Sequence, residues 1–113
     1  MAQTFTAEQV ITRAAGDLGR WVPGEALGAV ERDVLNNAYS TVLQEIGKII
    51  AINDPNECPA LVYDVICNMT AIYASSAFSN VPLDYNAIEV AERRLRYLIA
   101  QTPTYEPLQV YYF

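Results

Sequence analysis

Apolar residues recur at every third or fourth position from Val30 to Ile50, a spacing that aligns them along one face of an α-helix. Charged and amide side chains fill most of the positions between them. This run is the longest of its kind in the chain, so it predicts a helix that starts near Glu25 and forms the spine of the fold. Gly28 and Gly47 disfavour a helix interior, so we expect either end of this helix to fray or bend.

A shorter helix is predicted before it, over residues 7–18. Thr6 and Gln9 have the spacing of a capping box, in which two side chains satisfy backbone amides that are free at the start of a helix. Apolar residues continue from there at helical spacing. Gly19 then supplies the residue type that most readily adopts the left-handed conformation found at helix ends.

The third predicted helix covers residues 60–78 and has a single charge, Asp64. Pro59 suits the first position of a helix, where its missing amide hydrogen is no loss. A helix that is apolar around most of its circumference is typical of one packed between neighbours. No stretch of the chain approaches the roughly 20 uninterrupted apolar residues of a membrane span, so we expect no membrane insertion. The polar residues that interrupt this helix are Asn68, Thr70, Ser75 and Ser76.

A fourth helix is predicted from Tyr85 to Ala100, with Asp84 as its cap. Two glutamates each precede an arginine by four positions, an arrangement that stabilises a helix by about 0.2–0.5 kcal/mol per pair. The predicted inward stripe consists of Ile88, Ala91, Leu95, Leu98 and Ile99. The two predicted ion pairs are Glu89 with Arg93 and Glu92 with Arg96.

The end of the chain changes character. Pro103 and Pro107 exclude regular helix, and the uncharged, β-branched and aromatic residues that follow are typical of a strand. An exposed strand edge promotes aggregation, so we expect it to pair with a partner's sheet or to pack on its own domain. The predicted architecture is all-α: a four-helix bundle-like domain over residues 1–101 and an extended, strand-like C-terminal arm over residues 102–113.

Candidate partner-binding residues lie in the first turn and in this arm. Tryptophan and arginine are enriched where interfaces gain most of their binding energy, so Trp21 beside Arg20 is a candidate anchor. The alternative for this tryptophan is that it plugs the end of the helical core. In the arm the candidates are Leu108, Val110, Tyr111, Tyr112 and Phe113.

The residues for catalysis or metal binding are missing. The chain has no histidine, the commonest general base and metal ligand near neutral pH, so Cys58 and Cys67 have no histidine to complete a zinc site. Asp54 and Glu57 lie in a turn that lacks the regular oxygen ligands of a calcium loop. We therefore expect no enzyme activity, no catalytic residue, no metal and no cofactor. Both cysteines are expected to remain free thiols.

The net charge of −6 disfavours a protein whose task is to grip a phosphate backbone. The one basic cluster consists of Arg93, Arg94 and Arg96. Pairing within the helix is its preferred interpretation, and phosphate contact is the alternative. An acidic subunit could also line a conduit through which DNA moves without being held.

The opening FTAEQVITRAAGDLG, residues 5–19, resembles the N-terminal signature of phage tail accessory factors, also called packaged-DNA-stabilisation or head-completion proteins. The later run ALVYDVICNMTAIYA, residues 60–74, is similar to the third helix of that family in its apolar-Asn-apolar-Ala texture. The resemblance covers about residues 5 to 100 and depends on the order and spacing of the parts. Between these runs it passes through Gly24, Glu25, Glu31, Val34, Leu35, Asn36 and Asn37.

This resemblance implies a structural virion protein, a head-to-tail adaptor that forms a homo-oligomeric ring, commonly of twelve copies, beneath the portal of a tailed bacteriophage. The ring would extend the DNA channel, help to retain packaged DNA and provide a platform for tail proteins, without sequence-specific DNA binding. Residues 108–113 would then dock on the portal protein or a neighbouring subunit. The expected location is the virion, with the host cytoplasm during assembly. The alternative is a helical protein–protein adaptor or small regulatory subunit outside any virion.

Overall fold

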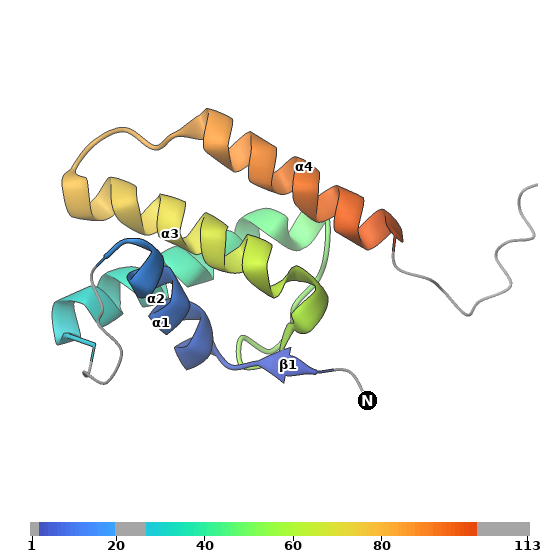
Figure 1. Cartoon of the computed structure of the whole chain (residues 1–113), viewed down its shortest axis with the longest axis horizontal. Helices are drawn as coiled ribbons and strands as arrows, with labels where there is room; N and C mark the ends of the chain where they lie inside the picture. Colours follow the sequence, from blue (N-terminus) through green and yellow to red (C-terminus); the bar gives the residue numbers. More distant parts are fainter. Residues whose placement is uncertain (1–2, 20–26, 102–113) are drawn as a thin grey trace, which may run out of the picture.

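The structure is a computed structural model that describes residues 3–19 and 27–101. These residues are mostly helical and contain four α-helices and one pair of short strands, which is compatible with the all-α class (Figure 1). In chain order the elements are β1 (Thr4–Phe5), α1 (Ala7–Asp17), α2 (Ala29–Glu45), η1 (Ile46–Lys48), β2 (Cys58–Pro59), η2 (Ala60–Val62), α3 (Tyr63–Ser79) and α4 (Tyr85–Gln101).

The predicted capping box at the start of α1 is confirmed. Gln9 donates its backbone N–H to Thr6 Oγ1 at 3.2 Å, and the Gln9 side-chain oxygen accepts from the Thr6 amide at 2.8 Å. The helix ends at Asp17, and Gly19 adopts a positive φ of 73°. These local signals therefore specify both ends of α1 to within a residue.

The helix α2 is shorter than predicted at both ends. It begins at Ala29 with Gly28 as its N-cap residue, so the predicted start near Glu25 is wrong. It ends at Glu45, where the chain tightens into the 3-10 turn η1 that contains Gly47. Both glycines thus lie outside the α-helix, because a glycine costs stability in a helix interior. The buried face of α2 and η1 consists of Leu35, Ala38, Tyr39, Val42 and Ile46.

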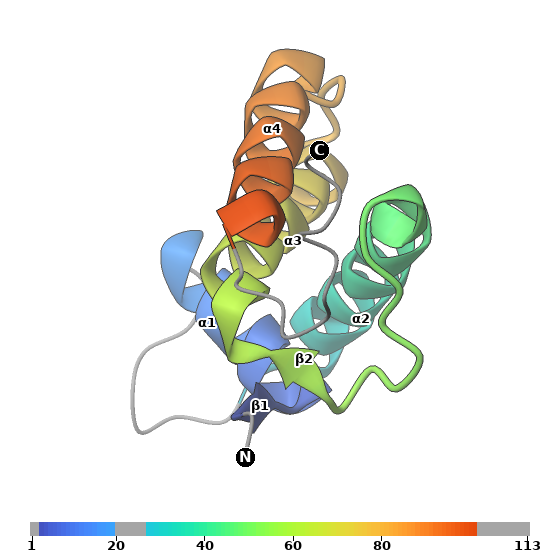
Figure 2. The same cartoon turned by 90° about the vertical axis from the view of Figure 1, so that its right-hand side faces the viewer.

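The helix α3 packs against α1, α2 and α4 and lies between them (Figures 1 and 2). This position confirms the prediction for an element that is apolar around most of its circumference. Its buried residues are Val65, Ile66, Cys67, Met69, Thr70, Ala71 and Ala74.

Among the described residues, one helical stretch, Ala60–Ser79, is long and apolar enough to cross a membrane, with a hydropathy of 1.2. Asp64, Asn68 and Thr70 interrupt this stretch, as noted from the sequence, and the expectation of no membrane insertion stays a prediction. A core helix passes the same test, and 44% of this stretch is buried inside the fold. Its contacts with three other helices account for its composition.

The two short strands were not predicted. Thr4 pairs with Pro59 and Phe5 with Cys58 in an antiparallel arrangement, so the segment before α1 lies beside the segment before α3. Pro59 is extended, with φ −61° and ψ 139°, and is not the first residue of a helix as predicted. The 3-10 turn η2 follows it, and α3 begins at Tyr63.

The helix α4 packs on α3 (Figure 2). Ile88, Ala91 and Leu95 of its predicted inward stripe are buried. The cap is also confirmed, since Asp84 Oδ1 accepts a hydrogen bond from the Ala87 amide at 3.1 Å. Of the two predicted ion pairs, Glu89 with Arg93 forms at 2.8 Å. Glu92 instead approaches Lys48 at 3.7 Å, so α4 is linked to the turn after α2.

Candidate partner-binding surfaces

The residues singled out from the sequence lie outside the described part of the chain. These are Arg20 and Trp21 in the first turn, and Leu108, Val110, Tyr111, Tyr112 and Phe113 in the arm. The described part offers other surfaces on which a partner could bind. Its exposed large apolar side chains are Val30, Leu61, Val81, Tyr85, Val90 and Tyr97.

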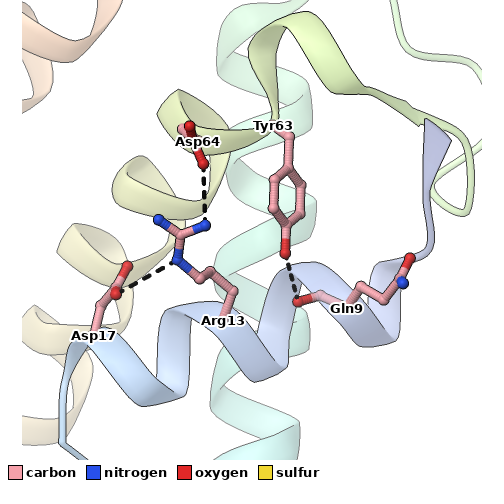
Figure 3. Close-up of polar contacts among 5 residues, drawn as sticks. All are labelled: Gln9, Arg13, Asp17, Tyr63 and Asp64. Carbon is pink, nitrogen blue, oxygen red and sulfur yellow. Dashed lines mark hydrogen bonds and ion pairs between the residues drawn. The ribbon is translucent and has the colours of Figure 1, made fainter. Parts of the chain in front are cut away.

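One surface lies where α1 crosses the start of α3 (Figure 3). Arg13 on α1 points toward two carboxylates and donates a hydrogen bond from Nη1 to Asp64 Oδ1 at 3.0 Å. Its Nε lies 3.7 Å from Asp17 Oδ1, one helical turn further along α1. The hydrogen bond to Asp64 raises the pKa of the Arg13 guanidinium above its ordinary value. This charged node joins α1 to α3 at the surface, where solvent screening limits its contribution to stability.

Aromatic rings lie beside this node. Tyr63, the first residue of α3, donates its hydroxyl to the Gln9 carbonyl at 3.3 Å. Its ring stacks on Phe5, with centroids 3.9 Å apart and an interplanar angle of 18°. The guanidinium carbon of Arg13 lies 5.8 Å from the Tyr63 ring centroid, within reach of a cation–π interaction. Burial raises the pKa of the Tyr63 hydroxyl to about 12, so it remains a proton donor at neutral pH.

These groups line an open hollow of about 350 Å³. Aromatic and arginine side chains are the types that most often anchor protein interfaces, so the hollow is a chemically suitable contact point. Two of its acceptors are already engaged within the chain: the Gln9 carbonyl by the Tyr63 hydroxyl, and the Glu8 carboxylate by Arg32. The lining residues are Phe5, Glu8, Gln9, Thr12, Arg13 and Tyr63.

A second groove of about 340 Å³ lies between the end of α1, the middle of α3 and the start of α4. Several of its polar groups have partners inside the chain. Asp17 lies near Arg13, Asp84 caps α4, and Ser76 donates its hydroxyl to the Val81 carbonyl at 2.6 Å. These polar groups therefore serve the fold, and the remaining lining is mixed, with Asn68 and Ser75 beside apolar residues such as Ile72.

The outer side of α4 is the third surface. Val90 and Tyr97 are 61% and 59% exposed, although both are apolar in their larger part. Arg94 lies between them at helical spacing and is also exposed. The helix contains three arginines against two glutamates, an excess of one positive charge.

The two cysteines are free and fully buried. Burial raises the pKa of Cys58 to about 11 and the pKa of Cys67 to about 12. Both therefore remain thiols near neutral pH, and a thiol is a much weaker nucleophile and metal ligand than a thiolate. In residues 3–19 and 27–101, no three cysteine or carboxylate side chains gather in a way that could hold a metal ion.

No pattern in the sequence predicts the stack between Phe5 and Tyr63, because the two residues are far apart along the chain. The strand pair, itself not predicted, and the packing of α1 on α3 bring those two segments together. Comparison with models of protein families, with curated proteins and with solved structures finds no match to this chain.

Proposed function

We propose that this chain is a structural subunit of the head-to-tail connector of a tailed bacteriophage. In this role it forms a ring beneath the portal, extends the DNA channel, helps to retain packaged DNA and offers a platform to tail proteins. The observation that carries the proposal is the order and spacing of two segments, residues 5–19 and 60–74, which resemble those of the adaptor family.

The packing of the described helices supports this proposal. The two resembling segments are α1 and the start of α3, which pack against each other. The helices α1, α2 and α4 pack against α3, and exposed apolar side chains remain on α2, η2, α4 and the turn between α3 and α4. Such side chains suit a subunit that has contacts with several neighbours.

The charge of the chain also suits a conduit for DNA. Its net charge is −6, and α1, α2 and α3 each have more carboxylates than arginines or lysines. A wall of this sign repels the phosphate backbone, so DNA passes along it without being trapped. The ring therefore needs no sequence-specific contact with DNA.

In the proposed function the arm, residues 102–113, attaches the ring to its partner. The segment 108–113 has no charge and consists largely of β-branched and aromatic residues. It adds a strand to a sheet edge of the portal protein or of a neighbouring subunit, where backbone hydrogen bonds provide affinity.

The test mixes the purified chain with the portal protein encoded beside its gene and measures the complexes by native mass spectrometry. We expect several copies of the chain on each portal ring. A chain that ends at Gln101 should bind more weakly, while a full-length Glu57→Gln variant, changed at an exposed residue just before β2, should bind as the parent does. Equal binding by the truncated chain would remove the arm from the mechanism. No binding by the full-length chain would favour an adaptor outside the virion.

A further inference from the structure

The charges of the four helices are unevenly distributed. The helices α1, α2 and α3 together contain six carboxylates and two arginines, Arg13 and Arg32. Both of these arginines are paired within the chain, with Asp64 and with Glu8. The helix α4 contains three arginines and two glutamates, so it is the one α-helix of the described part with a net positive charge.

The positive charge of α4 accompanies exposed apolar surface. Because α4 packs on α3 through Ile88, Ala91 and Leu95, its opposite side faces outward. Val90, Arg94 and Tyr97 follow one another at intervals of four and three residues, so they lie along the same outward stripe. We call these three residues the α4 face.

The helix α2 has a stripe of the opposite sign. Val30 is 69% exposed, the second highest value among the large apolar residues of the described chain. Asp33 follows three positions later and Asn37 four positions after that, and both are exposed. We call Val30, Asp33 and Asn37 the α2 face. It combines an apolar side chain with a carboxylate about one helical turn away, and the α4 face likewise combines Val90 with Arg94 about one turn away.

We infer that the α4 face of one copy docks on the α2 face of the next copy. Val90 and Tyr97 then cover Val30, and Arg94 pairs with Asp33, so that apolar area and opposite charges match. Both helices have 17 residues, or about 25 Å, so they can lie alongside each other over several turns. A second copy is the favoured occupant because this chain itself supplies both the exposed carboxylate and the exposed arginine.

This contact uses different surfaces on the two copies. The helices α2 and α4 pack on different sides of α3, so one copy can be bound on both sides at once (Figure 2). Head-to-tail contacts of this kind produce a ring when the rotation between copies closes, and a filament when it does not. The inference depends on the proposed function for closure into a ring, whereas the contact between copies is tested separately.

Charge reversal gives the sharpest test, because Asp33 and Arg94 are both exposed and neither has an ion-pair partner among the described residues. Self-association of the full chain is measured by sedimentation velocity and native mass spectrometry, both alone and with the portal protein. We expect Asp33→Arg and Arg94→Glu each to weaken the association about tenfold or more, because each places like charges in contact. The control Glu57→Arg makes the same charge change as Asp33→Arg, away from both faces, and should leave the association intact.

Two further samples test whether the α4 face of one copy contacts the α2 face of the next copy. The double variant Asp33→Arg/Arg94→Glu restores opposite charges and should associate within about threefold of the parent. An equal mixture of the two single variants should also associate, because each copy then meets a complementary neighbour on both sides. Circular dichroism and the unfolding temperature of each variant show whether it is folded.

The inference is overturned if the parent chain stays monomeric both alone and on the portal, if the single variants associate like the parent, or if neither the double variant nor the mixture recovers. It is also overturned if Arg94→Glu loses affinity for double-stranded DNA while Asp33→Arg associates normally, because α4 would then be a phosphate-binding surface. If the copies associate through these faces but do not bind the portal protein, the proposed function is refuted and the contact between copies is still supported.

Discussion

Replacing Ile66 with alanine tests whether α3 is the core helix of the fold. The Ile66 side chain is fully buried on the helix that packs against α1, α2 and α4. The substitution removes three carbon atoms, each worth about 0.8 kcal/mol of lost burial, and leaves a cavity that adds to the cost. We therefore expect the free energy of unfolding to fall by about 3–4 kcal/mol, a large share of the roughly 5–15 kcal/mol of a domain of this size.

The assay is urea unfolding followed by circular dichroism, with the slope of the transition compared between variants. Ile66→Val removes one carbon and should cost about 1 kcal/mol. Val90→Ala, on the exposed side of α4, should change the free energy by less than about 0.5 kcal/mol. A loss below about 1 kcal/mol for Ile66→Ala would refute the packing of α3 at the centre of the fold. It would also reopen the question of why Ala60–Ser79 is so apolar.

Three further outcomes follow from the polar contacts. Thr6→Ala removes the α1 cap and should lower the free energy of unfolding by about 1 kcal/mol, while Thr6→Ser should retain it; equal losses would contradict the capping role. Tyr39→Phe removes the 2.7 Å bond from the hydroxyl to the Pro55 carbonyl and should cost about 1 kcal/mol in the same urea assay. Burial raises the pKa of the Cys67 thiol from its ordinary 9.0 to about 12 in the folded chain. The free energy of unfolding should therefore fall as pH rises from about 9 towards about 12, because the unfolded thiol loses its proton first. In unfolding measurements across this pH range, Cys67→Ala should reduce the fall in the free energy of unfolding with pH. An unchanged fall would contradict the role of the Cys67 thiol.

Local signals explain what the sequence predicted well. The cap at Thr6 and the cap at Asp84 depend on residues three positions away, and both form as expected. The inward stripe of α4 depends only on helical spacing, and its central residues are buried. Features that depend on residues close together in the sequence could therefore be predicted from the sequence alone.

Features that depend on contacts between segments far apart in the sequence could not be predicted from it. The strand pair joins Phe5 to Cys58, and no pattern in either short segment indicates the other. Because that pairing extends Pro59, the predicted start of the third helix was wrong by several residues. Glu92 approaches Lys48, outside its own helix, because η1 lies close to α4 in space. The surface around Arg13 and Tyr63 was missed for the same reason.

The most direct test of the proposed connector is an electron cryomicroscopy map of the chain bound to its portal protein. The proposal predicts a closed ring of identical copies beneath the portal, with residues 108–113 hydrogen-bonded as an added strand to the portal or to an adjacent copy. A map in which that segment packs only on its own helices, or in which single copies bind without contacting one another, would contradict it.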